Sequence, residues 1–215
     1  MIKIIHAHNR KHYPHHIHQM HVLRKETFSD RMKWDVDVLG GWEIDGFDAC
    51  DPLYVLSVDA SDNVRGCLRL LPTTGPNMLA DVFPDLLNRG QPKISHPNIW
   101  ESSRFCVRLG NLRDSRSLKA FNRVTAELIA GMGEVALHSG VDQIVTVYDH
   151  LLRRIIGRAG CQETLVGGPN MIGGVKTYAG LFDINKDELE AFKNHWGIEA
   201  SDIAQALSRE LEIAA

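Results

Sequence analysis

The residues best suited to chemistry lie in one stretch, Ile99–Val107, with the sequence IWESSRFCV. Its aromatic and β-branched residues predict a strand. This strand carries an acid, Glu101, and a base, Arg104, three positions apart. Such side chains transfer protons or bind charged groups. Because consecutive polar positions in a buried strand are costly without partners or function, the stretch indicates a reaction site or a buried ion pair. An edge strand with solvated side chains is a third interpretation.

The alternation of side chains along a strand restricts how these groups act together. Glu101 and Ser103 fall on one face, and Ser102 and Arg104 fall on the other. The acid and the base can therefore contribute to one pocket only if the strand twists or bulges between them. We predict such a bulge.

Size and composition predict one globular domain. The chain has 215 residues, of which 44% are hydrophobic and 24% are charged. A net charge of −3 gives no reason to expect a nucleic-acid partner. The beginning of the chain is too short and too polar downstream for a signal peptide, and no run is long enough to span a membrane. The four cysteines show no C-x-x-C spacing, so we expect reduced thiols and a cytoplasmic protein.

Hydrophobic periodicity predicts a mixed, mostly antiparallel, twisted sheet with helices on both faces, an α/β (α+β) fold. The expected strands are 2–6, 53–59, 64–71, 98–107, 143–148, 163–166 and 175–182. The expected helices are 15–28, 78–87, 116–139, 151–158, 186–196 and 202–213. Because the helix at 116–139 connects strands 98–107 and 143–148 as a crossover, these two strands are expected to be parallel neighbours.

Residues 29–52 show little periodicity and contain aromatic residues and six aspartates. A long loop in a compact domain is usually functional or disordered, and disordered loops rarely hold this many aromatic residues. We therefore expect an ordered lid or binding loop. In the hairpin that follows, Arg65 and Arg69 are expected on the same face of the second strand.

Seven of the eleven histidines lie between His6 and His21. Their spacing is irregular and no carboxylate lies between Ile2 and Arg24. A solvated helix face is therefore favoured over a metal site, and we predict no metal.

Several motifs resemble the acyl-homoserine-lactone synthases, the autoinducer synthases of bacterial quorum sensing, which are related to the GCN5-type N-acyltransferases. The resemblance covers about residues 1–182 and leaves a helical tail at 185–215. The segment 108–113 matches the pyrophosphate loop of generic acetyltransferases poorly, in agreement with this family, which lacks that loop. The matching residues, in chain order, are Arg24, Phe28, Trp34, the E-x-D-x-F-D run at 43–48, Arg69, the D-V-F-P run at 81–84, Glu101 and Arg104.

The resemblance implies an acyltransferase that moves an acyl chain from an acyl carrier protein thioester, or from coenzyme A, to the amine of S-adenosylmethionine. Lactone closure then releases methylthioadenosine. S-adenosylmethionine is a substrate, and no cofactor is expected. Glu101 would be the base and Arg104 the second catalytic residue. The implied S-adenosylmethionine contacts are Arg24, Phe28, Trp34, Asp45, Asp48 and Arg69. A structural ion-pair network that orders the loop is the competing interpretation of these charged residues.

The acyl pocket is expected between strands 98–107 and 143–148, under helix 116–139. Its expected residues are Phe83, Ser103, Phe105 and Thr146. In the family, a threonine at the place of Thr146 accompanies 3-oxo-acyl chains, although β-propensity alone also explains it. Basic residues would suit an acidic carrier protein, or would form a solvated helix face. They are Arg108, Arg113, Arg116, Lys119, Arg153, Arg154 and Arg158.

Two other functions remain open. One is an acyl-CoA N-acyltransferase of the same fold that acts on another amine, favoured if loop 28–48 does not close over an adenosyl group. The other is a degenerate, non-enzymatic family member that only binds S-adenosylmethionine or a partner protein. Retention of Glu101 together with Arg104 argues against the second.

Overall fold

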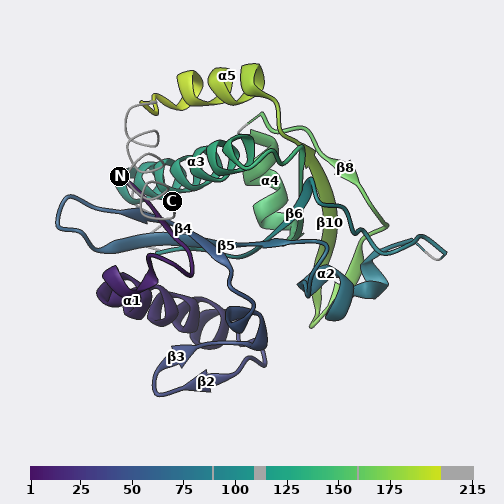
Figure 1. Cartoon of the computed structure of the whole chain (residues 1–215), viewed down its shortest axis with the longest axis horizontal. Helices are drawn as coiled ribbons and strands as arrows, with labels where there is room; N and C mark the ends of the chain where they lie inside the picture. The colour runs from purple at the N-terminus through teal and green to yellow at the C-terminus, as the bar shows by residue number, and fades with distance from the viewer. Residues whose placement is uncertain (89, 109–114, 159, 200–215) are drawn as a thin grey trace.

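The computed structural model describes residues 1–88, 90–108, 115–158 and 160–199. Over these residues the main element is an eight-stranded sheet of order β1-β4-β5-β6-β7-β10-β8, with β9 paired to β10 (Figure 1). The strands are β1 (Ile2–Ile5), β4 (Leu53–Val58), β5 (Val64–Pro72), β6 (Ile99–Val107), β7 (Gln143–Asp149), β8 (Thr164–Leu165), β9 (Asn170–Ile172) and β10 (Val175–Asp183). All these pairings are antiparallel except β6–β7, which is parallel. The predicted mixed sheet and its parallel pair are confirmed.

Helices cover both faces of the sheet, as predicted. The helices are α1 (Pro14–Lys25), α2 (Met78–Asp81), α3 (Ser115–His138), α4 (His150–Arg158) and α5 (Lys186–Trp196). Figure 1 shows α3, α4 and α5 on one side of the sheet, and α1 and α2 on the other. A core of aliphatic side chains lies between α3 and strands β1, β4 and β5, and a second core lies under α1. The helix predicted at 202–213 lies outside the described residues.

The predicted bulge is present in β6. Cys67 of β5 pairs with Cys106 of β6, and Arg69 pairs with Ser103, so one residue of β5 spans two residues of β6. Arg104 lies in this irregularity with a left-handed backbone, φ 55°, which is uncommon for a residue other than glycine. The extra residue interrupts the alternation, so Glu101 and Arg104 now project from the same face.

A second bulge makes one of our expectations wrong. Ser57 pairs with Gly66 and Val58 pairs with Val64, so Arg65 is an extra residue in β5. Arg65 consequently turns toward α3 and binds Glu127 at 2.8 Å, whereas Arg69 faces the other side. The two arginines do not share a face, because strict alternation fails at a bulge.

Residues 26–52 form an ordered lobe rather than an irregular loop. A π-helical turn (Glu26–Arg31) continues from α1. A small hairpin follows, made of β2 (Val38–Leu39) and β3 (Trp42–Glu43), and then a 3₁₀ turn (Gly46–Ala49). Asp45 and Asp48 form a capping box on this last turn, in which the side chain of each residue accepts a hydrogen bond from the backbone N–H of the other. The prediction of an ordered loop is confirmed, although its hairpin was not foreseen.

The histidine-rich segment forms a 3₁₀ turn (Arg10–His12) and α1. Within the described part of the chain, no three His, Cys, Asp or Glu side chains lie together in a way that could hold a metal ion. None of the described helices is long and apolar enough to cross a membrane.

Candidate active site

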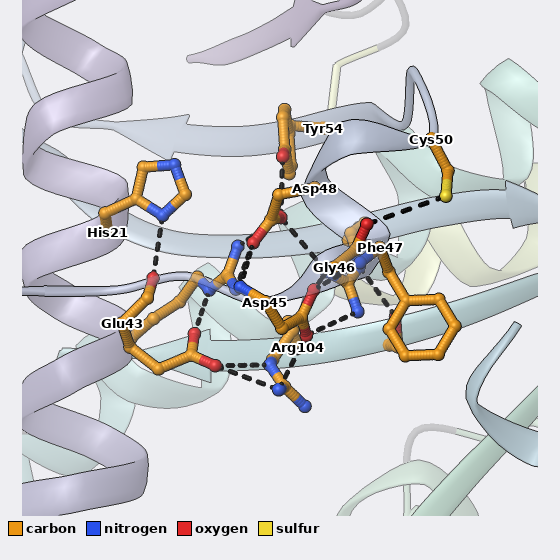
Figure 2. A network of polar contacts seen from close by, with 12 residues as sticks. His21, Glu43, Asp45, Gly46, Phe47, Asp48, Cys50, Tyr54 and Arg104 are labelled. Atoms are coloured by element: carbon orange, nitrogen blue, oxygen red, sulfur yellow. Dashed lines mark hydrogen bonds and ion pairs between the residues drawn. The ribbon is translucent and has the colours of Figure 1, made fainter. Parts of the chain in front are cut away.

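Three arginines and three carboxylates meet on the face of the sheet that carries α1. The arginines come from α1, β5 and β6, and the acids come from the lobe between α1 and β4. Figure 2 shows Glu43, Asp45, Asp48 and Arg104 of this network close together, although the acids and the arginine come from distant parts of the chain. The members are Arg24, Arg69, Arg104, Glu43, Asp45 and Asp48. With three charges of each sign, this network is balanced when all six groups are ionised.

Arg24 and Arg69 hold the inner part of the network. Arg24 donates to both carboxylate oxygens of Asp48, at 2.8 and 2.9 Å, and to Glu43 at 2.5 Å. Arg69 donates to Asp45 at 2.6 and 3.1 Å and to Asp48 at 3.0 Å. Both guanidinium groups are inaccessible to solvent, with 1% and 0% of the residue exposed. These two arginines therefore pair with the acids of the lobe, in agreement with the competing interpretation of their charges, and their contact with substrate stays a prediction.

Arg104 holds the outer part of the network. Its guanidinium donates to Glu43 at 2.9 Å and pairs with Asp45 at 2.7 Å. It also lies over the ring of Phe28, 5.2 Å from the centroid, and Phe28 stacks on Trp34 at 5.3 Å. The side chains of Arg104 and Asp45 remain partly accessible, at 9% and 14%. An aromatic wall and two accessible charges of opposite sign therefore lie side by side.

The environment of Asp48 keeps this group ionised. Burial alone raises the pKa of Asp48, but hydrogen bonds and charge from Arg24, together with the charge of Arg69, lower it well below its ordinary value. Tyr54 donates its hydroxyl to the same carboxylate at 2.7 Å, and burial together with Asp48 raises the pKa of this phenol. The ion pair between Arg24 and Asp48 therefore persists across the neutral range.

The lowered pKa of Asp48 predicts how stability depends on pH. A carboxyl whose folded pKa lies below its unfolded value, about 3.9, stabilises the fold above that value. Its contribution is lost as the pH falls toward the folded pKa. Urea unfolding between pH 3 and pH 7 should show stability falling at acid pH, by up to about 1.4 kcal/mol per unit from this one group. Asp48→Asn should remove this component of the slope, whereas the change Asp35→Asn at an exposed position should not. An unchanged slope in Asp48→Asn would contradict the account.

Glu101 lies beside the network and is 1% exposed. Its carboxylate accepts the backbone N–H groups of Met78, at 3.0 Å, and Leu79, at 2.6 Å, where α2 begins. Burial raises the pKa of Glu101, and these two hydrogen bonds oppose the shift. Arg104 reaches the same helix, because its Nη1 donates to the sulfur of Met78 at 3.3 Å. The bulge and α2 thus bring the two predicted catalytic side chains together.

The four residues expected in the acyl pocket are divided between the two faces of the sheet. Ser103 accepts a hydrogen bond from Arg69 at 3.2 Å, on the face of the charged network. Phe83 packs with Leu79 and Leu86 on that same side, whereas Phe105 packs with the core under α3. Thr146 pairs with Ser102 at the last paired position of β6 and β7. The acyl pocket therefore stays a prediction.

Two residues of the site were missed as functional residues. Glu43, which is fully buried, bridges Arg24 and Arg104. Its signal was present in the E-x-D-x-F-D run. Met78 contacts both Glu101 and Arg104, but a methionine at the start of a short helix carries no such signal.

Of the predicted basic surface, Arg113 lies outside the described residues, and Arg153 is paired with Glu163.

The sheet, with its bulged central strand and one parallel pair, has the GCN5-related acyltransferase fold. An acyl-CoA N-acyltransferase of Pseudomonas aeruginosa shares this fold, with a TM-score of 0.53 at 13% identity over 85% of this chain and 99% of that chain. The more specific match is to the autoinducer synthase family, whose sequence profile covers residues 8–192. The chain belongs to this family. The match extends past residue 182, into α5, and includes most of the histidine-rich segment.

Individual relatives agree with this assignment. A probable acyl-homoserine-lactone synthase of Sinorhizobium fredii is 41% identical over 167 residues, which is 78% of this chain and 79% of that protein. The structure of the acyl-homoserine-lactone synthase LasI has a TM-score of 0.75 at 33% identity, covering 86% of this chain and 90% of LasI. BjaI, a CoA-dependent acyl-homoserine-lactone synthase solved with S-adenosylmethionine and isopentyl-CoA, has a TM-score of 0.81 at 31% identity, covering 93% and 90%.

Proposed function

We propose that this enzyme is an acyl-homoserine-lactone synthase that makes a quorum-sensing signal from S-adenosylmethionine and an acyl thioester. The amine nitrogen of S-adenosylmethionine attacks the thioester carbonyl, the carbon–sulfur bond breaks, and the thiol leaves with a proton. The carboxylate oxygen of the same substrate then displaces the sulfonium, which closes the lactone and releases neutral methylthioadenosine. The observation that carries the proposal is the placement of Glu101 and Arg104 on one face, beside a lobe of acids and aromatic rings.

The accessible edge of the network would hold S-adenosylmethionine. Phe28 and Trp34 offer stacked rings to its sulfonium, because a cation near an aromatic face is favourable. Arg104 suits the substrate carboxylate, since a guanidinium binds carboxylates in a bidentate manner. Asp45 suits the substrate amine. Arg24, Arg69 and Asp48 are occupied by one another, so their part is to hold the lobe in position.

The exposed aromatic face of the lobe gives a prediction about substrate binding. Trp34, 37% exposed, should contribute to S-adenosylmethionine affinity but not to the chemical step. Trp34→Ala should raise KM for S-adenosylmethionine by about tenfold or more with little change in kcat. Trp34→Phe keeps an aromatic face and should lose less. Steady-state kinetics at saturating acyl donor checks this. If the Ala and Phe variants have the same KM for S-adenosylmethionine, the aromatic ring does not contribute to binding.

Glu101 would remove a proton from the amine, through a water molecule, before attack. A raised pKa makes a carboxylate a stronger base near neutral pH.

The developing oxyanion needs hydrogen-bond donors. Pairing between β6 and β7 ends at Ser102 and Thr146, although β6 continues to Val107. Backbone groups of β6 beyond this point are suited to that task, and they are adjacent to the proposed acyl pocket of Phe83, Ser103, Phe105 and Thr146.

The acyl donor is proposed to be an acyl carrier protein thioester, with coenzyme A as the alternative. BjaI, which is CoA-dependent, supports the alternative. Methylthioadenosine release with octanoyl-carrier protein and with octanoyl-CoA, at equal concentrations, separates the two donors. The proposal predicts a kcat/KM at least about tenfold higher for the carrier protein, since steering by complementary charge raises association rates. Equal or inverted values would favour coenzyme A.

We further propose that the reaction needs no cofactor and takes place in the cytoplasm, where acyl thioesters are available. Dialysis against a chelator followed by assay tests the first point, with unchanged turnover as the expected result. Loss of turnover that added metal restores would contradict it.

A further inference from the structure

A cluster of polar and aromatic side chains on β7, α4 and β10 has no role in the steps above. Tyr148 of β7 donates its hydroxyl to Glu163, and Glu163 is held by an ion pair with Arg153 of α4. The guanidinium of Arg153 lies 4.5 Å above the ring of Tyr178, and the Tyr148 and Tyr178 rings stack at 6.2 Å. Tyr148 is only 3% exposed. The Tyr148 side chain is therefore held in place by the hydrogen bond of its hydroxyl, by the ring that stacks on its face, and by the surrounding packed residues.

This phenol lies beside Thr146. Alternation places Thr146 and Tyr148 on the same face of β7, and their antiparallel partners on β10 are Gly180 and Tyr178. A Cβ atom at position 180 would overlap the Tyr148 hydroxyl, so the phenol lies across the backbone of Gly180. Because Gly180 is the direct partner of Thr146, the ring occupies the volume next to the threonine.

We propose that Tyr148 is a specificity-determining residue that closes one end of the acyl pocket and limits the length of the acyl chain. The inference rests on the proposed function, which places the acyl chain where the β6–β7 pairing ends, at Ser102 and Thr146. Tyr148 follows two residues beyond this point on the same face. A chain that passes Thr146 therefore meets the ring next.

A fixed ring is an effective limit, because a packed interior resists added methylene groups. Neither displacement nor rotation of the phenol is easy here. Displacement would break the bond to Glu163 and the stacking on Tyr178, and rotation is hindered by Phe182, whose ring lies 6.0 Å away. Glu163 and Arg153 act as positioning residues that hold the ring in place. The ring's volume, rather than its hydroxyl, sets the limit.

The test is a chain-length profile. Methylthioadenosine release is measured with saturated acyl thioesters of increasing length, for the wild type, Tyr148→Val and Tyr148→Phe. For each enzyme, kcat/KM for a donor longer than the wild-type optimum is divided by kcat/KM for the optimal donor. In Tyr148→Val this ratio should rise by about tenfold or more. Tyr148→Phe keeps the ring volume and should retain the wild-type profile. KM for S-adenosylmethionine should be unchanged in both variants, which shows that the charged network is intact.

The outcomes separate this inference from the function on which it rests. If the wild type turns over no donor, the proposed function fails. If the wild type is active but Tyr148→Val keeps the wild-type profile, the inference alone is overturned. If the valine variant does not fold, Tyr148→Leu replaces it, because this change removes less volume. Its chain-length profile should shift in the same direction, toward longer donors. A shifted profile in Tyr148→Phe would also overturn the inference, because it would assign the selection to the hydroxyl.

Discussion

Glu101→Gln is expected to lower kcat/KM by about 10²–10⁴-fold, the range typical for loss of a general base. The amide cannot accept the proton of the substrate amine. The same change also affects stability, because both carboxylate oxygens accept backbone N–H groups at the start of α2. One of these donors would face the amide nitrogen of Gln, so the free energy of unfolding should fall by about 1–3 kcal/mol. Kinetics and urea unfolding of the same preparation measure the two effects separately.

A second buried carboxylate provides the matched control. Glu127 of α3 accepts hydrogen bonds from Ser57 and Arg65, outside the site. Glu127→Gln should therefore lower stability. Its kcat/KM should stay within about twofold of the wild type, because substitutions at distant sites usually have independent effects. If Glu101→Gln remains as active as Glu127→Gln, then Glu101 only anchors α2 and another group is the base.

Arg24→Met is expected to have the largest effect on stability. The change leaves the buried carboxylates of Glu43 and Asp48 without their shared cation. Removal of one partner from a buried ion pair costs about 3–5 kcal/mol. The lobe between α1 and β4 depends on this cation, so KM for S-adenosylmethionine should rise together with the loss of stability. Urea unfolding and limited proteolysis within residues 26–52 measure the two consequences.

The exposed ion pair between Arg108 and Glu26 is the control for Arg24. Both of its side chains are about half exposed, at 45% and 44%, and such pairs contribute about 0–1 kcal/mol. Arg108→Met should therefore leave stability nearly unchanged. A similar, small effect in both arginine variants would show that the network does not order the lobe.

The sequence predicted most of the sheet because most of its strands are rich in apolar and β-branched residues and are separated by clear turns. It also predicted the bulge in β6, and the reason was chemical: an acid and a base three positions apart cannot share a pocket on a regular strand. The bulge at Arg65 was not predicted, because no comparable conflict marked that position. Its side chain turns toward Glu127, and only the packing of α3 on the sheet reveals this.

The sequence allowed two interpretations of the charged residues, substrate contact and an ion-pair network, but it did not predict which arginine pairs with which acid. Arg24, Arg69, Asp45 and Asp48 were expected to contact substrate, whereas the structure pairs them mainly with one another. Which arginine meets which acid depends on how the lobe folds over the sheet, and this tertiary arrangement leaves no periodic pattern. The contact between Tyr148 and Glu163 was missed for the same reason, because it joins β7 to a segment beyond α4.

In the proposed reaction, one protein joins the amine of S-adenosylmethionine to an acyl chain and closes the lactone. The most direct measurement is mass spectrometry of a reaction that contains purified protein, an acyl thioester, and S-adenosylmethionine labelled in the aminobutyryl carbons of its methionine moiety but not in the S-methyl group. This reaction yields labelled acyl-homoserine lactone and unlabelled methylthioadenosine in equal amounts, and both products should be strongly reduced in Glu101→Gln. Acylated product that retains the adenosyl group, or no product with any thioester despite bound S-adenosylmethionine, would contradict it.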